Sequence, residues 1–129
     1  MSFEQDISRW TNKAERRMDA AFKTAVQNLV EESQTPRARG GRMPVDTSFL
    51  RNSGQAALNS VPSGGSSPSN MDSVPLVISR AQPGDRIVFG WTAQYARAME
   101  NRYAFMRSAA QNWNKIAFQA VKEAERRIR

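Results

Sequence analysis

The first quarter of the chain has the apolar spacing of an amphipathic helix. Apolar side chains recur at gaps of three and four, which predicts one long helix over residues 3–34. Ser2 and Gln5 fit a capping box at its start. Pro36 ends it, because a proline disfavours helical geometry in the residue before it. The apolar stripe consists of Phe3, Ile7, Trp10, Ala14, Met18, Ala21, Phe22, Ala25, Leu29 and Val30.

This predicted helix is longer than the domain that would contain it. About 32 residues at about 1.5 Å each span roughly 48 Å. A compact domain of 129 residues has a diameter of only roughly 36 Å. Either the helix breaks, or its first turns are buried against another subunit. We favour the second interpretation, which makes Phe3, Ile7 and Trp10 candidate interface residues.

The middle of the chain predicts short elements joined by loops. Residues 35–44 form a basic loop that contains glycine, and residues 45–53 are typical of a turn that leads into a weakly alternating strand over 55–61. The turn can direct Phe49 and Leu50 inward. Three of its residues are able to cap a helical turn: Asp46, Thr47 and Ser48.

The clearest strand signal follows a loop rich in Gly, Ser and Pro over residues 62–73, which we predict to be flexible. Two apolar runs flank the turn residues 82–85, so residues 74–91 predict an antiparallel hairpin. One face of this hairpin should carry Ile87, Phe89 and Trp91, with Val74, Leu76 and Ile78 as their partners.

The last third of the chain predicts two helices. Thr92 can cap a short helix that runs through Tyr95, Ala96 and Met99. Residues 104–128 predict a long C-terminal helix, since its apolar residues fall on one stripe. We therefore expect one domain over residues 1–129, of the α+β class, with a small antiparallel sheet packed on two long helices. The stripe consists of Phe105, Ala109, Trp113, Ile116, Ala120, Ala124 and Ile128.

The composition argues against catalysis. The chain has no cysteine and no histidine, which removes thiolate zinc sites, cysteine nucleophiles and the commonest general base. No serine lies in a nucleophile elbow, and no D-x-D-x-D cluster suggests a metal site. We expect no enzyme activity, no cofactor and no metal. No apolar run approaches the roughly 20 residues of a membrane span, and the N-terminus does not resemble a signal peptide, so we expect a cytosol-like compartment.

Positive charge is concentrated in two regions. Nineteen Lys and Arg against twelve Asp and Glu give a net charge of +7. Residues 35–62 hold four basic and one acidic group (+3), and residues 86–129 hold nine and three (+6). Such a balance favours nucleic acid, anionic surfaces or acidic proteins as partners. The alternative is a solvated face on an arginine-rich helix.

Several short motifs occur in an order that resembles a known family. The first is Pro44-Val45-Asp46-Thr47-Ser48-Phe49-Leu50-Arg51-Asn52-Ser53, and the second is Phe89-Gly90. Tyr95-Ala96-Arg97-Ala98-Met99-Glu100 and Phe105-Met106-Arg107-Ser108-Ala109 follow. In order and rough spacing they resemble the neck, or tail-completion, proteins of lambdoid long-tailed bacteriophages. Ser48 and Asn101 stand where that family usually has glycine.

The resemblance implies a structural virion protein at the head–tail junction, made in the host cytoplasm. It would form a ring, commonly of six copies, between the connector or head-closure proteins and the tail terminator or tail tube. The motif residues that the resemblance marks as structural are Asp46, Thr47, Leu50, Arg51, Ser53, Tyr95, Glu100 and Phe105. Two alternatives remain: a tail terminator or head-closure ring protein, and a small basic nucleic-acid-binding protein.

Some of these residues also invite other roles. Asp46 and Glu100 could form a catalytic pair, but we favour a structural role, in which Asp46 caps a turn and Glu100 pairs with an arginine such as Arg51 or Arg97. Trp91 and Trp113 should pack in the core, whereas Trp10 should anchor an interface.

Arg37, Arg39 and Arg42 lie together in the basic loop. They could face DNA that passes through a ring, or acidic patches on a neighbouring protein. No helix-turn-helix or zinc motif surrounds them, so base-specific reading is not expected. Tight basic contacts would also hinder the passage of DNA. We therefore favour a protein–protein contact and keep a non-specific DNA contact as the alternative.

Overall fold

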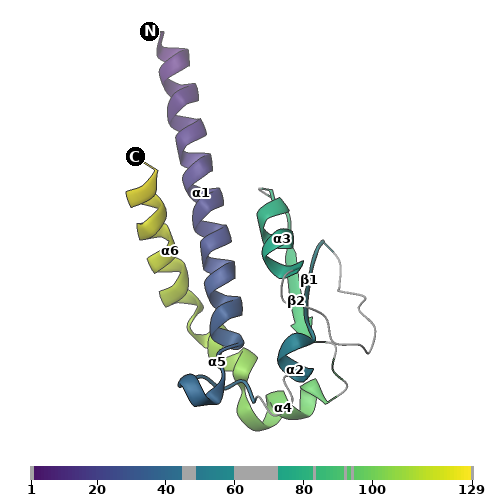
Figure 1. The fold of residues 1–129 in the computed structure, drawn as a ribbon. Coiled ribbons are helices and arrows are strands. Elements are labelled where there is room, and N and C mark those ends of the chain that lie inside the picture. Colours follow the sequence, from purple (N-terminus) through teal and green to yellow (C-terminus); the bar gives the residue numbers. More distant parts are fainter. Residues whose placement is uncertain are drawn as a thin grey trace.

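The computed structural model describes residues 2–44, 49–59, 73–82, 84–91, 93 and 95–128 (Figure 1). It is an α+β fold, as the sequence predicts, with a long N-terminal helix, a two-stranded antiparallel sheet, short helices and a C-terminal helix. The elements are α1 (Phe3–Ser33), a 3-10 helix η1 (Arg37–Arg39), α2 (Phe49–Asn52), β1 (Gly54–Leu58), α3 (Ser73–Arg80), β2 (Ile87–Trp91), α4 (Ala96–Tyr103), α5 (Phe105–Gln111) and α6 (Trp113–Arg127).

Helix α1 is one unbroken helix of 31 residues, as its apolar spacing predicts. The capping box at its start is confirmed: the Gln5 backbone N–H donates to Ser2 Oγ at 3.2 Å, and the Ser2 N–H donates to Gln5 Oε1 at 3.3 Å. The helix ends at Ser33, three residues before Pro36. The basic loop then turns back through η1, so that the Met43 N–H donates to the Thr35 carbonyl at 3.0 Å.

The sheet pairs β2 with β1, and the predicted hairpin over residues 74–91 is wrong. Gly54 lies opposite Trp91 and Leu58 opposite Ile87, while residues 73–80 form helix α3. Both conformations place Val74 and Ile78 on one face, since they are four residues apart. The two side chains do pack against Ile87 and Phe89, but they do so from a helix.

The predicted helix over residues 104–128 is also corrected, because it is divided into α5 and α6. The division lies at Asn112, whose side-chain amide donates to Glu32 of α1 at 3.0 Å. Another break separates α4 from α5 at Ala104, which has a left-handed backbone with φ 54°. The apolar stripe continues across Asn112, so periodicity alone does not reveal the break.

Helix α6 runs antiparallel to α1 and forms a helix pair with it (Figure 1). Ala25 of α1 packs there with Ile116 and Ala120 of α6. Small alanine side chains let the two backbones approach closely, in the manner of ridges packed into grooves. A second buried cluster joins α1 to α3 and the sheet, and a third joins the basic loop to α2 and α5 through Met43, Leu50 and Phe105.

Several sequence predictions lie outside the described residues. These are the turn residues Asp46, Thr47 and Ser48, the cap Thr92, the end of the strand predicted over 55–61, and all but the last residue of the loop predicted over 62–73. They stay predictions.

Candidate assembly surfaces

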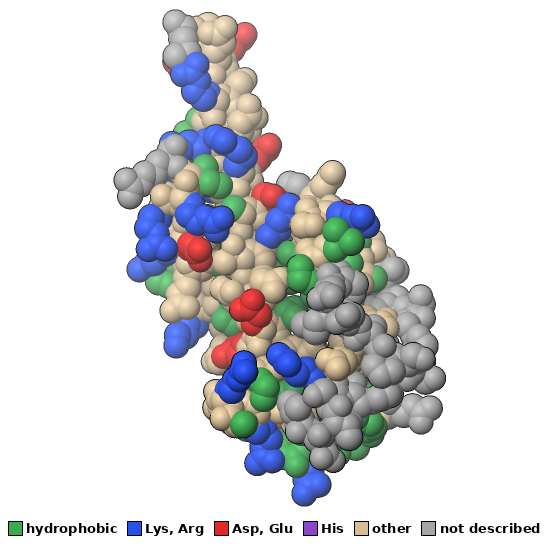
Figure 2. Space-filling model, viewed as in Figure 1, with side chains coloured by type: hydrophobic (Ala, Val, Ile, Leu, Met, Phe, Trp, Pro, Cys, Tyr) green, Lys and Arg blue, Asp and Glu red, His purple; other side chains and the backbone are tan. Residues whose placement is uncertain are grey.

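The N-terminal part of α1 extends beyond the rest of the chain. We call residues 3–13 the overhang. The Arg17 guanidinium (Nε) donates to the carbonyl of Ile128 at 2.6 Å, so the described end of the C-terminal segment lies beside Arg17, fourteen residues after the start of α1 at Phe3. Figure 1 shows α1 projecting past the end of α6, and Figure 2 shows the same projection standing clear of the molecular surface. The first turns of α1 thus extend beyond the described end of α6, whereas the base of the overhang, at Trp10 and Lys13, lies beside this helix.

The overhang carries apolar side chains on the face that would need a packing partner. Phe3 is 78% exposed, Ile7 47% and Trp10 72%. At 100° per residue, these three positions continue the stripe of Ala21 and Ala25, which is buried against α6. The face therefore has the same helical phase as a core stripe and lacks only the covering element. The sequence prediction that this end is left without a core is confirmed.

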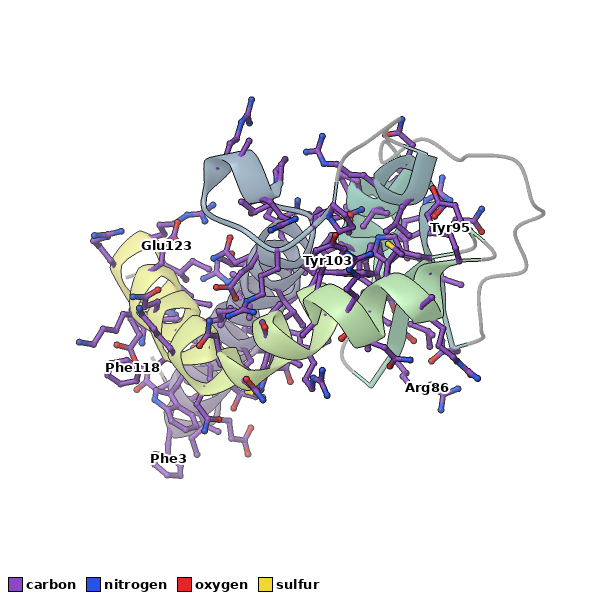
Figure 3. All side chains as sticks on the ribbon, turned by 90° about the horizontal axis from the view of Figure 1, so that it is seen from below. Phe3, Arg86, Tyr95, Tyr103, Phe118 and Glu123 are labelled. Atoms are coloured by element: carbon purple, nitrogen blue, oxygen red, sulfur yellow. The ribbon has the colours of Figure 1, made fainter. Side chains whose placement is uncertain are left out.

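The apolar surface continues along the helix pair. At the base of the overhang, Trp10, Ala14, Met18 and Val121 line a shallow hollow of about 250 Å³ between α1 and α6. Phe118 is exposed on the outer side of α6 with Lys122 over its ring at 4.6 Å. Figure 3 shows Phe3 and Phe118 both pointing away from the helix pair.

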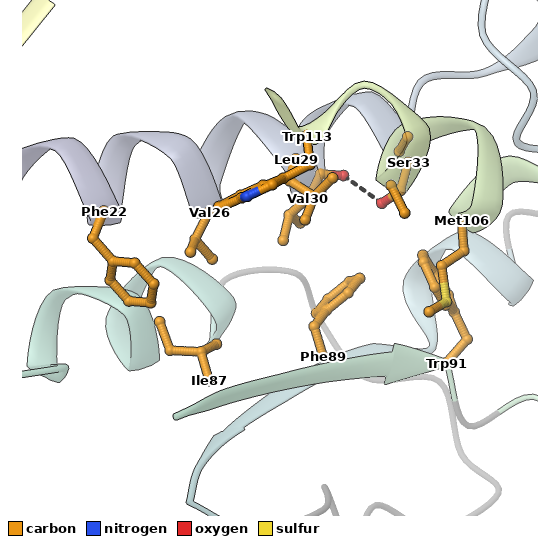
Figure 4. A pocket seen from close by; sticks show the side chains of 12 residues that line it. Phe22, Val26, Leu29, Val30, Ser33, Ile87, Phe89, Trp91, Met106 and Trp113 are labelled. Atoms are coloured by element: carbon orange, nitrogen blue, oxygen red, sulfur yellow. Dashed lines mark hydrogen bonds between the residues drawn. The ribbon is translucent and has the colours of Figure 1, made fainter. Parts of the chain in front are cut away.

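An apolar groove lies at the other end of α1, between this helix and the sheet. It has a volume of about 400 Å³ and is walled by α1, β2, α5 and the start of α6 (Figure 4). Ile87, Phe89 and Trp91 of β2 form one wall, as their predicted alternation onto one face requires. The full lining consists of Phe22, Val26, Leu29, Val30, Ser33, Ile87, Phe89, Trp91, Met106, Ala109, Ala110 and Trp113.

The groove is open and almost without polar groups. Phe22 is 41% exposed, Met106 50% and Trp113 36%. The prediction that Trp113 packs in the core is therefore wrong, because its ring lines the open groove. Ser33 contributes the one hydroxyl among the described lining residues, and it already donates to the carbonyl of Val30 at 2.7 Å. A polar ligand would find few partners here. The groove suits an apolar side chain.

Gln34 forms a buried polar junction that the sequence analysis missed. Its side-chain amide donates to the Arg51 carbonyl at 3.0 Å, and its side-chain oxygen accepts from the indole N–H of Trp91 at 3.0 Å. The Arg51 guanidinium in turn donates to the Gln34 carbonyl at 3.1 Å. These bonds fasten the end of α1 to α2 and β2. The one signal in the sequence is that Gln34 comes four residues after Val30, the last residue of the apolar stripe, and so lies on the same helical face.

The motif residues that the structure describes serve local structure. Glu100 does not pair with Arg51 or Arg97 as expected; its carboxylate accepts the backbone N–H groups of Met106 at 2.8 Å and Arg107 at 3.0 Å. It thereby caps the start of α5, where Ala104 has no side-chain acceptor. The others are mostly buried: Leu50, Ser53 and Phe105 lie in the interior, whereas Tyr95 is exposed.

The arginines of the basic loop are exposed but do not act alike. The Arg37 guanidinium stacks on the ring of Tyr103 at 4.7 Å, a cation–π contact that holds the loop against α4. Arg39 and Arg42 line a polar hollow together with Glu32. This loop and the overhang lie at opposite ends of α1 (Figure 1), so the candidate interface residues form two separate surfaces.

One carboxylate has a shifted pKa. The backbone N–H of Gln82 donates to Asp85 at 2.8 Å and lowers the pKa of that carboxyl, with a smaller lowering from the side-chain amide of Asn59 at 3.2 Å. Asn59 also accepts from the Arg86 N–H at 2.9 Å. Asp85 therefore fixes the turn that leads into β2, at a solvent-exposed position.

Comparisons with known proteins give no further guide. No protein-family model matches the chain, and searches of curated proteins and of solved structures found no match. Within the described ranges, no helix has both the length and the apolar character needed to cross a bilayer. Nor do the described residues bring together three or more side chains that could hold a metal ion.

Proposed function

We propose that this protein is a structural subunit of a tailed bacteriophage, which forms a ring at the head–tail junction and joins the completed tail to the head. The motif order from Pro44 to Ala109 suggests the family. The overhang is the observation that carries the proposal, because a rigid helix with an exposed core-like stripe needs a neighbour. Its partners would be other copies, commonly six to a ring, and the connector and tail proteins on either side.

The exposed stripe has enough apolar area to drive association. An aromatic side chain buries roughly 200 Å², so Phe3 and Trp10, at 78% and 72% exposure, leave together about 300 Å² in water. At about 25 cal/mol per Å², covering this area is favourable by about 7 kcal/mol before the entropy of association is subtracted. A monomer would gain nothing from keeping these side chains exposed.

A truncated chain tests the role of the overhang in the particle. Deletion of residues 1–10 removes Phe3, Ile7 and Trp10 but leaves the helix pair from Ala14 onward. We expect the truncated chain to fold, with the helical circular dichroism of the shortened sequence, and to be absent from phage particles. Cryo-imaging of particles made with the intact chain should place it in ring density at the neck. Incorporation of the truncated chain would contradict the role of the overhang. Density at another place in the particle would contradict a neck ring, and its position would distinguish a tail terminator from a head-closure ring.

A second candidate function rests on the charge of +7 and the exposed Arg39 and Arg42. A basic nucleic-acid-binding protein should lose affinity for duplex DNA steeply between 50 and 200 mM salt, by about 10³-fold if six phosphates are contacted. A ring subunit should instead keep its self-association over this range, since apolar burial depends little on salt. Replacement of Arg37, Arg39 and Arg42 by Ser should weaken assembly if the basic loop contacts a neighbouring protein. Intact assembly with lower retention of packaged DNA would instead favour a DNA contact.

A further inference from the structure

We infer that the overhang of one copy docks in the apolar groove of a second copy. The inference rests on the proposed ring, and it names the two surfaces that would meet between neighbouring subunits. The overhang presents Phe3, Ile7 and Trp10, and the groove presents the wall of Ile87, Phe89 and Trp91 opposite α1.

The two surfaces cannot meet within one chain. Phe22 and Val26 of α1 line the groove, while Trp10 belongs to the overhang of the same unbroken helix. Trp10 and Val26 are sixteen residues apart, or about 24 Å along the axis. A continuous helix does not fold back on itself, so any contact between overhang and groove joins two molecules.

The spacing of the apolar groups agrees with a helix lying in a groove. Phe3, Ile7 and Trp10 occupy positions i, i+4 and i+7, the anchor pattern of helices that bind apolar grooves. From Phe3 to Trp10 the helix rises about 10 Å. Along β2, the side chains from Ile87 to Trp91 span about 13 Å on one face. The overhang thus carries three anchors over a length close to that of the wall.

The volume of the groove and the exposed apolar area of the overhang also agree with this docking. A cavity of about 150 Å³ holds one benzene ring, so the groove of about 400 Å³ has room for two or three side chains of that size. A standard interface buries about 800 Å² per partner, of which about 450 Å² is apolar. The roughly 300 Å² exposed by Phe3 and Trp10 supplies about two-thirds of that. One contact would be weak, and a closed ring of such contacts would be stable.

This contact makes assembly directional. Overhang and groove are different surfaces, so each copy has one of each to offer, and head-to-tail addition continues until a ring closes. A contact between two overhangs would instead stop at a dimer and leave both grooves open to water.

The absence of cysteine allows a direct test by single-cysteine cross-linking. Ile7→Cys places a thiol on the overhang and Met106→Cys places one at the groove; both sites are about half exposed, so both variants should fold. The two full-length chains are mixed in equal amounts and treated with a short bismaleimide. We expect the cross-link between Ile7→Cys and Met106→Cys to exceed both homodimers. Leu76→Cys, at an equally exposed site on α3 outside the groove, replaces Met106→Cys as the matched control and should give little product.

Other outcomes overturn the inference. Dominant cross-linking of Ile7→Cys to itself would indicate an overhang pair, and equal yields with Met106→Cys and Leu76→Cys would indicate random collision. Trp10→Ala should weaken self-association, measured by sedimentation velocity, by about 30-fold or more if Trp10 is a central anchor. Unchanged self-association would show that Trp10 does not lie in the interface. If the chain enters neck rings but the selective cross-link is missing, the docking is wrong and the proposed function stands. If the chain is absent from phage particles, the proposed function is wrong, whatever the cross-linking shows.

Discussion

The two ends of α1 differ in how far their side chains are buried and hydrogen-bonded. At the C-terminal end, Gln34 bonds to two other elements, and Val30 and Ser33 are buried. At the N-terminal end, Phe3 and Trp10 remain largely exposed although they lie on the same helical stripe as buried alanines. One helix therefore packs in the interior at one end and exposes an apolar stripe at the other. The capping box at Ser2 keeps the exposed end helical without tertiary support.

This difference predicts a large loss of stability when Trp91 is replaced and a small one when Trp10 is replaced. Trp91 packs edge-to-face against Phe89 and Phe105, with ring centroids 4.8 and 4.7 Å apart. Trp91→Ala should lower the free energy of unfolding by about 3 kcal/mol, because a cavity replaces the indole. Trp10→Ala should change it by less than about 0.5 kcal/mol. Urea unfolding of both variants measures the contrast, and similar losses would show that the overhang is part of the monomer's core.

Substitution of Gln34 in the polar junction should lower the free energy of unfolding almost as much as Trp91→Ala. Gln34→Ala removes the acceptor of the Trp91 indole and the donor to the Arg51 carbonyl, so we expect a loss of about 2–4 kcal/mol from two hydrogen bonds and two unpaired groups. Gln27→Ala is the matched control, because Gln27 lies on α1 and its side-chain amide donates to Glu31 at the surface. A small effect of Gln34→Ala in thermal unfolding would show that water replaces these bonds.

The loop after the junction should tolerate no side chain at Gly41. An added Cβ would overlap the carbonyl of Thr35, which already accepts from Met43. Gly41→Ala should therefore cost about 1–3 kcal/mol of unfolding free energy, as overpacking does. Gly90→Ala, where a Cβ meets open space, is the control and should be nearly neutral. Equal stability of the two variants would mean that the loop shifts freely.

The smallest effect on stability is expected for Asp85→Asn, because Asp85 lies in an exposed turn. The folded state lowers the pKa of its carboxyl from 3.8, so ionised Asp85 stabilises the fold above that pH, and the stabilisation is lost as pH falls through the lowered value. The difference in stability between the chain and Asp85→Asn should thus be constant from pH 7 to about 5 and shrink towards about pH 2. Unfolding midpoints measured over this range test the sign. A difference that grows on acidification would contradict it.

Sequence periodicity was a reliable guide where one interpretation fitted the apolar residues. The stripe of α1 extends over about eight turns, so the helix followed from its spacing, and its exposed first turns followed from its length. Residues 74–78 allowed two interpretations, because Val74 and Ile78 share a face in a strand and in a helix alike. One signal in the sequence favoured the helix: Pro75 suits a first helical turn, where no N–H is needed. The exposure of Leu76, which the hairpin would place on the packed face, agrees with it.

The groove and the polar junction could not be predicted because they depend on tertiary contacts. Ile87, Phe89 and Trp91 were assigned correctly to one face, but the partner strand was not, so the space opposite that face was unknown. Gln34 looks like an ordinary helix-end residue until α2 and β2 are placed beside it. The role of Glu100 at α5 was hidden for a related reason, since Ala104 interrupts the helix through a backbone angle that an alanine rarely adopts.

In the proposed ring, the unbroken backbone of α1 would also set the distance and direction between neighbouring subunits. Each residue inserted after Thr11 would turn Phe3, Ile7 and Trp10 by about 100° about the axis and move them outward by about 1.5 Å. One extra residue would aim the anchors away from a neighbour's groove. Seven extra residues would restore their direction to within about 20° and lengthen the reach by about 10 Å. In such a ring, the number of residues between these anchors and Ala14 would therefore set both the tilt between adjacent copies and the width of the ring.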